Sequence, residues 1–304
     1  MSRAFVFPGQ GSQAVGMGKE FADAFPAARE VFEEVDDALG QKLSKLMFEG
    51  PEDELTLTEN AQPALMAVSM AAMAVLKAEG GVEIQKVAEF VAGHSLGEYS
   101  ALAAVGTFSL ADTARLLKTR GKAMQQAVPV GEGAMAALLG LDLDQAKEVV
   151  EEAAQGDVLA TANDNAPGQV VVSGKKEAVE RAVDVAKEKG AKRAMLLQVS
   201  APFHCPMMAP AADVMAEALA AVTIEAPLVP PARVTDYQEG ASYSILVEHD
   251  AGTVLIQGSA GFVEGALDGR QADVVLLGVG LLGTRDEDYM NAYWHEMVAT
   301  TGAR

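Results

Sequence analysis

Residues 93–97 read Gly-His-Ser-Leu-Gly, a pattern that places Ser95 to act as a nucleophile. Small residues on either side permit the strained backbone that raises a serine hydroxyl from a tight turn, and a helix after the turn directs its positive end toward the hydroxyl. The backbone N–H of Leu96 then points to where an oxyanion forms. The pattern predicts chemistry through an acyl-serine, with a structural serine on a plain turn as the alternative.

A serine nucleophile needs a base, and the chain has four histidines: His94, His204, His249 and His295. His94 is adjacent to Ser95, so its side chain diverges from the hydroxyl and is predicted to be structural or to contact substrate. His204 lies in a Ser-Ala-Pro-Phe-His-Cys-Pro segment whose prolines stiffen a loop, and we predict that it is the base. A structural histidine is the alternative. Cys205 is interpreted as buried packing.

Strands and helices must alternate to hold these residues. Apolar runs at residues 4–7 and 87–92 predict strands, and helical patterns at 63–78 and 98–105 follow or precede them. A glycine-rich loop at 8–13 joins the first strand to a helical stretch. The predicted fold class is α/β: a mostly parallel sheet with helices on both faces, as in acyltransferases and hydrolases.

The pattern changes from Ala134 onward, where strands are predicted at 135–139, 158–162, 169–173 and 193–199 and helices at 142–153 and 175–189. This order, β-α-β-β-α-β, predicts an inserted ferredoxin-like small domain. Asn163, Asn165 and Gln169 lie at its central turn and face the cleft in this interpretation, although a plain β-turn explains them nearly as well. The predicted domains are a large domain, the small domain and an atypical C-terminal segment. Their residues are 1–127 with 199–228, then 128–198, then 229–304.

Composition narrows the function classes. The chain has 304 residues, half of them apolar, and a formal net charge of -20, which argues against binding of nucleic acid. One cysteine and four unsuitably spaced histidines predict no metal site. The apolar stretch at 63–76 is too short to cross a bilayer, and residues 1–7 do not resemble a signal peptide, so we expect a cytoplasmic protein.

An anionic substrate or partner must therefore meet a local basic patch, and one is expected around Lys118, Lys122, Lys192 and Arg193.

Five motifs occur together in the order found in malonyl-CoA:acyl carrier protein transacylases, and over about residues 1–228 the chain resembles that family. They are Phe-Pro-Gly-Gln-Gly-Ser-Gln at 7–13, Gly-His-Ser-Leu-Gly-Glu-Tyr-Ser-Ala at 93–101, Thr-Arg-Gly at 119–121 followed by Met-Gln at 124–125, Asn-Ala-Pro-Gly-Gln-Val-Val at 165–171, and Ala-Pro-Phe-His at 201–204.

The resemblance implies a ping-pong transfer in fatty acid biosynthesis. Ser95, activated by His204, takes the malonyl group from coenzyme A and passes it to the phosphopantetheine thiol of acyl carrier protein. Arg120 holds the free carboxylate of the malonyl group, which suits a planar guanidinium. The N–H groups of Gln10 and Leu96 form the oxyanion hole. No permanently bound cofactor is implied, because malonyl-CoA is the substrate.

The C-terminal segment departs from this family. The expected glutamine that orients the catalytic histidine is not recognisable, and residues 243–304 instead resemble a fragment of a metallo-β-lactamase-fold protein without its metal motif. Three alternatives stay open at this point. The first is malonyl transfer. The second is another serine enzyme, either a hydrolase or thioesterase or a transacylase for a different acyl group, and the third is an inactive fusion product.

Overall fold

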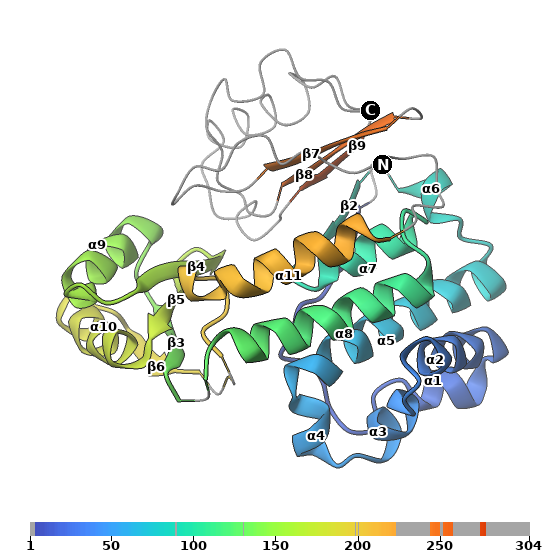
Figure 1. Cartoon of the computed structure of the whole chain (residues 1–304), viewed down its shortest axis with the longest axis horizontal. Helices are drawn as coiled ribbons and strands as arrows, with labels where there is room; N and C mark the ends of the chain where they lie inside the picture. Colours follow the sequence, from blue (N-terminus) through green and yellow to red (C-terminus); the bar gives the residue numbers. More distant parts are fainter. Residues whose placement is uncertain are drawn as a thin grey trace. The chain divides into compact units, whose positions relative to one another are not determined.

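The computed structural model describes residues 4–88, 90–129, 131–197, 199 and 201–222, together with the backbone of three strands at 244–249, 252–257 and 274–277 (Figure 1). These residues form an α/β fold that is rich in helices and has small sheets. Internal contacts divide the chain into two compact units. The first comprises Met1–Thr119, Ala218–Val279 and Asp286–Arg304, and the second comprises Arg120–Glu217 and Gly280–Arg285.

The first unit contains a two-stranded parallel sheet surrounded by helices. Its strands pair so that Phe7 lies opposite Gly93, which brings their carboxyl ends to the same edge. Loops leaving the carboxyl ends of parallel strands are the usual place for a site. The elements are β1 (Ala4–Phe7), α1 (Lys19–Ala24), α2 (Pro26–Leu39), α3 (Leu43–Glu49), α4 (Glu52–Thr56), α5 (Thr58–Gly80), α6 (Ile84–Val87), β2 (Phe90–Gly93), α7 (Gly97–Ala104) and the start of α8 (Leu110–Ala127).

Helix α5 forms the centre of the first unit. By length and composition it could span a membrane, but Ala64, Met66, Ala67 and Ala71 are completely buried in the protein core. Phe32 of α2 packs into the same cluster. Burial of this apolar surface, at about 25 cal/mol per Å², explains why the sequence is apolar along so much of the helix. We therefore interpret α5 as a core helix.

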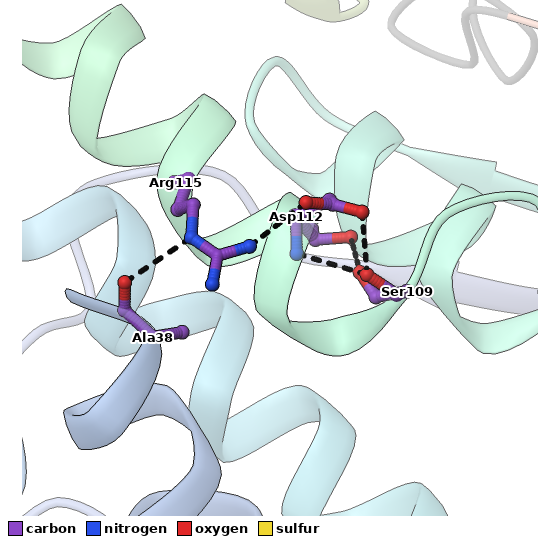
Figure 2. A network of polar contacts seen from close by, with 5 residues as sticks. Ala38, Ser109, Asp112 and Arg115 are labelled. Atoms are coloured by element: carbon purple, nitrogen blue, oxygen red, sulfur yellow. Dashed lines mark hydrogen bonds and ion pairs between the residues drawn. The ribbon is translucent and has the colours of Figure 1, made fainter. Parts of the chain in front are cut away.

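A polar network fixes the beginning of α8 (Figure 2). The Ser109 hydroxyl accepts a hydrogen bond from the Asp112 backbone N–H at 3.0 Å and donates to the Asp112 carboxylate at 2.8 Å. This is the arrangement of a helix N-cap. Arg115 pairs with Asp112 at 2.9 Å and donates to the Ala38 carbonyl at 3.3 Å. The network therefore ties α8 to the end of α2.

The second unit contains a four-stranded antiparallel sheet in the order β4-β5-β3-β6. The inner faces of α9 and α10 pack on it through buried residues such as Val149 and Val179. The elements are β3 (Gly133–Leu139), α9 (Leu143–Ala154), β4 (Leu159–Ala166), β5 (Gln169–Lys175), α10 (Lys176–Glu188), β6 (Arg193–Leu196), the 3-10 turn η1 (Pro206–Met208) and α11 (Ala209–Ala220), whose last residues fall in the first unit.

Three strands of the C-terminal segment have a described backbone. β7 (Ser244–His249) pairs antiparallel with β8 (Gly252–Gln257), and β8 pairs parallel with β9 (Val274–Leu277). β9 lies close to β2. The strands predicted at 243–247 and 253–257 are thus confirmed to within two residues, while residues 229–243, 258–273 and 278–304 lie outside the described residues.

Some predicted elements differ from those observed. The strand predicted at 87–92 begins later, because residues 84–87 form helix α6 and β2 covers Phe90–Gly93. A short apolar run does not distinguish strand from helix, which is the reason for the error. In place of one mostly parallel sheet, the described strands of the first unit form the parallel pair β1-β2 and a separate sheet β7-β8-β9, in which β8 and β9 are parallel. β6 ends at Leu196 rather than at residue 199. The predicted boundaries at 127/128 and 198/199 also lie away from the division by contacts, which assigns Arg120 and His204 to the second unit.

Candidate active site

Ser95 lies on a sharp turn between β2 and α7. Its backbone φ is 53°, in the left-handed region that residues with a side chain rarely adopt. Two backbone hydrogen bonds close the turn: Gly97 N–H donates to the His94 carbonyl at 2.9 Å, and Glu98 N–H donates to the Ser95 carbonyl at 3.2 Å. Strained backbone of this kind persists only where the surroundings enforce it. The geometry is that of a nucleophile on a strand-turn-helix.

The glycines on either side of Ser95 are required by space. A Cβ atom built on Gly93 would lie 1.9 Å from the carbonyl carbon of Gly97, and one built on Gly97 would lie 2.3 Å from the Phe7 carbonyl oxygen. Neither contact is sterically feasible. Both glycines therefore allow the turn to close on itself and on the end of β1.

The loop after β1 packs directly against this turn. His94 N–H donates to the Phe7 carbonyl at 3.0 Å, and a Cβ on Gly9 would lie 2.3 Å from His94 Nδ1. The sequence prediction that Gln10 and the Ser95 turn lie together is consistent with this contact. Among the hydrogen bonds between described backbone groups, none has the N–H of Gln10 or of Leu96 as its donor. The side chain of Gln10 donates to the Thr58 hydroxyl at 3.4 Å.

His204 lies in the second unit, in the loop between β6 and η1. It is exposed, whereas Ala201, Phe203 and Cys205 beside it are all at most 9% exposed. Its backbone φ is 57°, so it shares with Ser95 the rare left-handed conformation. Within residues 201–205, His204 is therefore the one exposed residue. The glycine pattern around Ser95 indicated a strained backbone there, whereas no sequence pattern indicated it at His204.

Arg120 and Asn165 are also in the second unit. Arg120 follows Lys118 on α8 and is half-buried, and Asn165 is exposed near the end of β4. The pairing of β4 with β5 shifts register between Thr161 and Asn163 and again between Asp164 and Ala166. Irregularities of this type redirect side chains and are common near active sites. They could not have been predicted from the sequence.

One residue of the expected basic patch, Lys118, is already paired within the first unit. Lys118 pairs with the Glu59 carboxylate at 3.0 Å and donates to the Asn60 side chain at 2.8 Å, with only 17% of its side chain exposed. It fastens α8 to the start of α5 and is not available to a partner. Lys192 and Arg193 are exposed on the second unit.

The structure thus brings together Gln10, His94, Ser95 and Leu96 in the first unit, and it places Arg120, Asn165 and His204 in the second. Of the other two histidines, His249 ends β7 and His295 lies outside the described residues. Within the part of the chain that the structure describes, no three His, Cys, Asp or Glu side chains gather as metal ligands do.

Comparison with known proteins gives concordant matches. A family model described as "Acyl transferase domain" matches residues 4–252. "Malonyl CoA-acyl carrier protein transacylase" of Bacillus subtilis (strain 168) is 50% identical over 228 residues, which cover 75% of this chain and 70% of that protein. The similarity covers the region in which the five motifs were found.

Solved structures agree. The acyl-carrier-protein-S-malonyltransferase from Bartonella henselae is 62% identical with a TM-score of 0.72, covering 74% of this chain and 71% of that one. A type II PKS acyl-carrier protein in complex with its malonyl-transacylase matches with 47% identity, a TM-score of 0.70, and the same two coverages of 74% and 71%.

The resemblance that the sequence suggested for the C-terminal segment is not supported by these comparisons. The likeness of residues 243–304 to a metallo-β-lactamase-fold fragment is not borne out, and the acyl transferase model itself extends to residue 252. Short alternating strands with glycine turns occur in many folds, so that pattern was not specific.

Proposed function

Because this chain belongs to the acyl transferase domain family, we propose that its reaction passes through a malonyl ester on Ser95, with His204 as the base. The chain is an acyltransferase that moves a malonyl group from coenzyme A to acyl carrier protein in fatty acid synthesis. Malonyl-CoA and acyl carrier protein are accordingly its two partners. The assignment of roles to individual residues is the proposal that follows.

In the first half-reaction, the imidazole of His204 accepts the proton of the Ser95 hydroxyl as the oxygen attacks the thioester carbonyl of malonyl-CoA. The N–H groups of Gln10 and Leu96 stabilise the oxyanion of the tetrahedral intermediate. The C–S bond then breaks, and the departing thiolate of coenzyme A takes the proton from His204. The product is a malonyl ester on Ser95.

The second half-reaction uses the same groups in reverse. His204 accepts the proton of the phosphopantetheine thiol of the carrier, and the sulfur attacks the carbonyl of the ester. The C–O bond to Ser95 breaks, and the serine oxygen regains a proton from His204. One serine and one histidine are therefore sufficient for both transfers.

Arg120 supplies selectivity in this proposal. Its guanidinium keeps its charge when desolvated and matches the free carboxylate of a malonyl group with two parallel hydrogen bonds. Its half-buried position near the middle of α8, which is anchored by Ser109 and Lys118, supports a fixed orientation. Asn165 and His94 are proposed to contact the acyl substrate.

The single observation that carries the proposal is the left-handed backbone of Ser95 between β2 and α7, closed by two glycines that admit no side chain. An intact-protein mass spectrum after mixing with malonyl-CoA tests it directly. We expect one malonyl adduct on the wild-type chain, none on Ser95→Ala, and much slower formation on His204→Ala. An adduct that persists on Ser95→Ala would contradict the proposal.

A second measurement separates malonyl transfer from acyl transfer or hydrolysis in general. Arg120→Ala should lose rate steeply with malonyl-CoA and little with acetyl-CoA, because only the former carries a carboxylate. An equal loss with both substrates would remove the role of Arg120. Release of free malonate at the rate of transfer would identify a hydrolase instead.

Four further assignments belong to the proposal. The sheet order β4-β5-β3-β6, with α9 and α10 packed on it, supports a ferredoxin-like small domain, as expected for a β-α-β-β-α-β segment. The predicted domains at 1–127 with 199–228, at 128–198 and at 229–304 are retained as functional divisions of the chain. Cytoplasmic residence and the lack of a permanently bound cofactor stay predictions.

A further inference from the structure

His204 is held in an unfavourable backbone conformation by a short segment, residues 202–205. A left-handed φ of 57° costs a residue with a side chain about 1–3 kcal/mol, so neighbouring contacts must enforce it. Both flanking residues are buried, with Phe203 at 8% exposed and Cys205 at 9%. Phe203 packs with Met135 of β3 and Val171 of β5. Phe203 therefore anchors the segment to the sheet of the second unit on one side of His204, and Cys205 is buried on the other side.

The ring of Pro202 lies directly on the backbone of β3. A Cβ built on Gly133 would be 2.3 Å from Pro202 Cγ and 2.5 Å from Pro202 Cδ. Gly133 is not in the left-handed region, so its lack of a side chain serves space and not backbone conformation. The close approach is possible only with glycine at position 133.

The thiol of Cys205 contacts Pro202 at its backbone carbonyl. Its S–H donates to the Pro202 carbonyl at 3.1 Å, across a turn whose third residue is His204. Burial raises the pKa of the Cys205 thiol, so the group stays protonated and remains a donor at neutral pH. A thiol that is buried, protonated and directed at a carbonyl oxygen is not a nucleophile.

Ser173 of β5 lies beneath this turn and is completely buried. Its hydroxyl is close enough to oppose the rise in the pKa of Cys205, but it forms no hydrogen bond of ordinary geometry with any described residue. The bond from Cys205 to Pro202 is a polar contact that closes the turn.

We infer that Gly133 and Cys205 are positioning residues for His204. Gly133 leaves room for the ring of Pro202 against β3, and Cys205 donates a hydrogen bond to the Pro202 carbonyl. Together these two contacts impose the left-handed backbone that presents the imidazole. This inference rests on the proposed function, in which His204 is the base for both half-reactions. Loss of either contact should misplace the imidazole without altering the residues that bind substrate.

The test compares five variants of the full chain for malonyl transfer, with kcat and KM for malonyl-CoA determined separately and thermal unfolding recorded for each. Cys205→Ala removes the donor, Cys205→Ser keeps one, and Gly133→Ala pushes on Pro202. Val179→Ala is the matched control, because it truncates a completely buried side chain of the same unit in another core cluster. His204→Ala tests the proposed function itself.

We expect kcat to fall about tenfold in Cys205→Ala and Gly133→Ala with little change in KM, because a displacement of about 1 Å in a catalytic group has effects of this order or larger. Cys205→Ser should stay within about threefold of the wild type, since a hydroxyl also donates to the carbonyl. Val179→Ala should lower the unfolding temperature while keeping its kcat at temperatures where it is folded.

Wild-type kcat in both Cys205→Ala and Gly133→Ala would overturn the inference, as would a kcat in Cys205→Ser as low as in Cys205→Ala. A fall in kcat of Val179→Ala that matches theirs would also overturn it, because general loosening of the unit would then explain the result. Full activity of His204→Ala would instead refute the proposed function, whichever result the other variants give.

Discussion

The second glycine of the Ser95 turn, Gly97, offers a test of the turn that is independent of any reacting group. It is the first residue of α7, and its Cα faces the end of β1. A Cβ atom at this position would lie 2.3 Å from the Phe7 carbonyl oxygen and 2.8 Å from that of Pro8, whereas real contacts are 3.0 Å or longer. In Gly97→Ala, the turn and the end of β1 must therefore separate by about 0.7 Å or more.

Two opposing effects set the size of the change in stability. Overpacking against backbone costs about 1–3 kcal/mol, while alanine is favoured over glycine in a helix by up to about 1 kcal/mol. We expect a net loss of about 0–3 kcal/mol in the free energy of unfolding. Activity should suffer more, because the same separation moves Ser95 relative to the loop that carries Gln10. A displacement near 1 Å predicts a fall in kcat of roughly tenfold to hundredfold.

The assay measures malonyl transfer to acyl carrier protein and, in parallel, urea unfolding. Gly80→Ala is the matched control: Gly80 ends α5 on the surface, its Cβ would meet only Val82 Cγ2 at an ordinary 3.5 Å, and alanine should leave kcat unchanged. If Gly97→Ala retained kcat within twofold of the wild type, the close approach of β1 to the turn would not be what positions Ser95, and this reasoning would be wrong.

Four other predictions concern a helix cap and charged side chains of the two units. Ser109→Ala should lower the free energy of unfolding by about 1 kcal/mol, measured in urea, because Ser109 caps α8; an unchanged value would show that the cap contributes nothing. Lys118→Met should destabilise the chain by roughly 1–2 kcal/mol without raising KM for acyl carrier protein, because Lys118 is paired with Glu59 and Asn60. Lys192→Glu combined with Arg193→Glu should instead raise that KM more than it changes kcat. The reverse pattern would contradict both assignments. The hydrogen bond from Arg181 lowers the pKa of Asp157, so the stability that this pair contributes is present at neutral pH and is lost as the pH falls below about 4. Between pH 6 and pH 3, Asp157→Asn should therefore lose less of its free energy of unfolding, measured in urea, than the wild type. An equal loss in both proteins would refute the linkage.

Local patterns were enough to predict the elements that carry the candidate site. The apolar run at 4–7 and the glycines after it correspond to β1 and its loop, and alternating apolar patterns predicted every element of the second unit from β3 to β6 within a few residues. These patterns reflect burial of one face, which is a property of neighbouring residues in the chain. The strand predicted at 87–92 was wrong in its first half because a short apolar run fits either a strand or a helix such as α6.

Contacts between distant segments were the part that the sequence could not supply. The expected role of Lys118 in a basic patch depended on its charge alone, and its pairing with Glu59 and Asn60 arises only when α8 packs beside the start of α5. The same holds for Gly133 and Pro202, which are far apart in the chain and meet through packing of the loop on β3. A glycine at the start of a strand carries no sign of the ring that will lie against it.

Backbone strain separates the candidate catalytic residues from the others more sharply than residue type does. Three described residues other than glycine have a positive φ: Ser95, Gln155 and His204. Gln155 ends helix α9 on the surface, where a left-handed residue is the common way for a helix to stop, so its conformation needs no functional reason. Ser95 and His204 end no helix. Each lies instead in a tight turn whose neighbours are packed so closely that glycine is required beside one and opposite the other. Since strain of this kind is retained only where the surrounding structure enforces it, the two residues proposed as nucleophile and base are also two whose backbone the surrounding structure constrains.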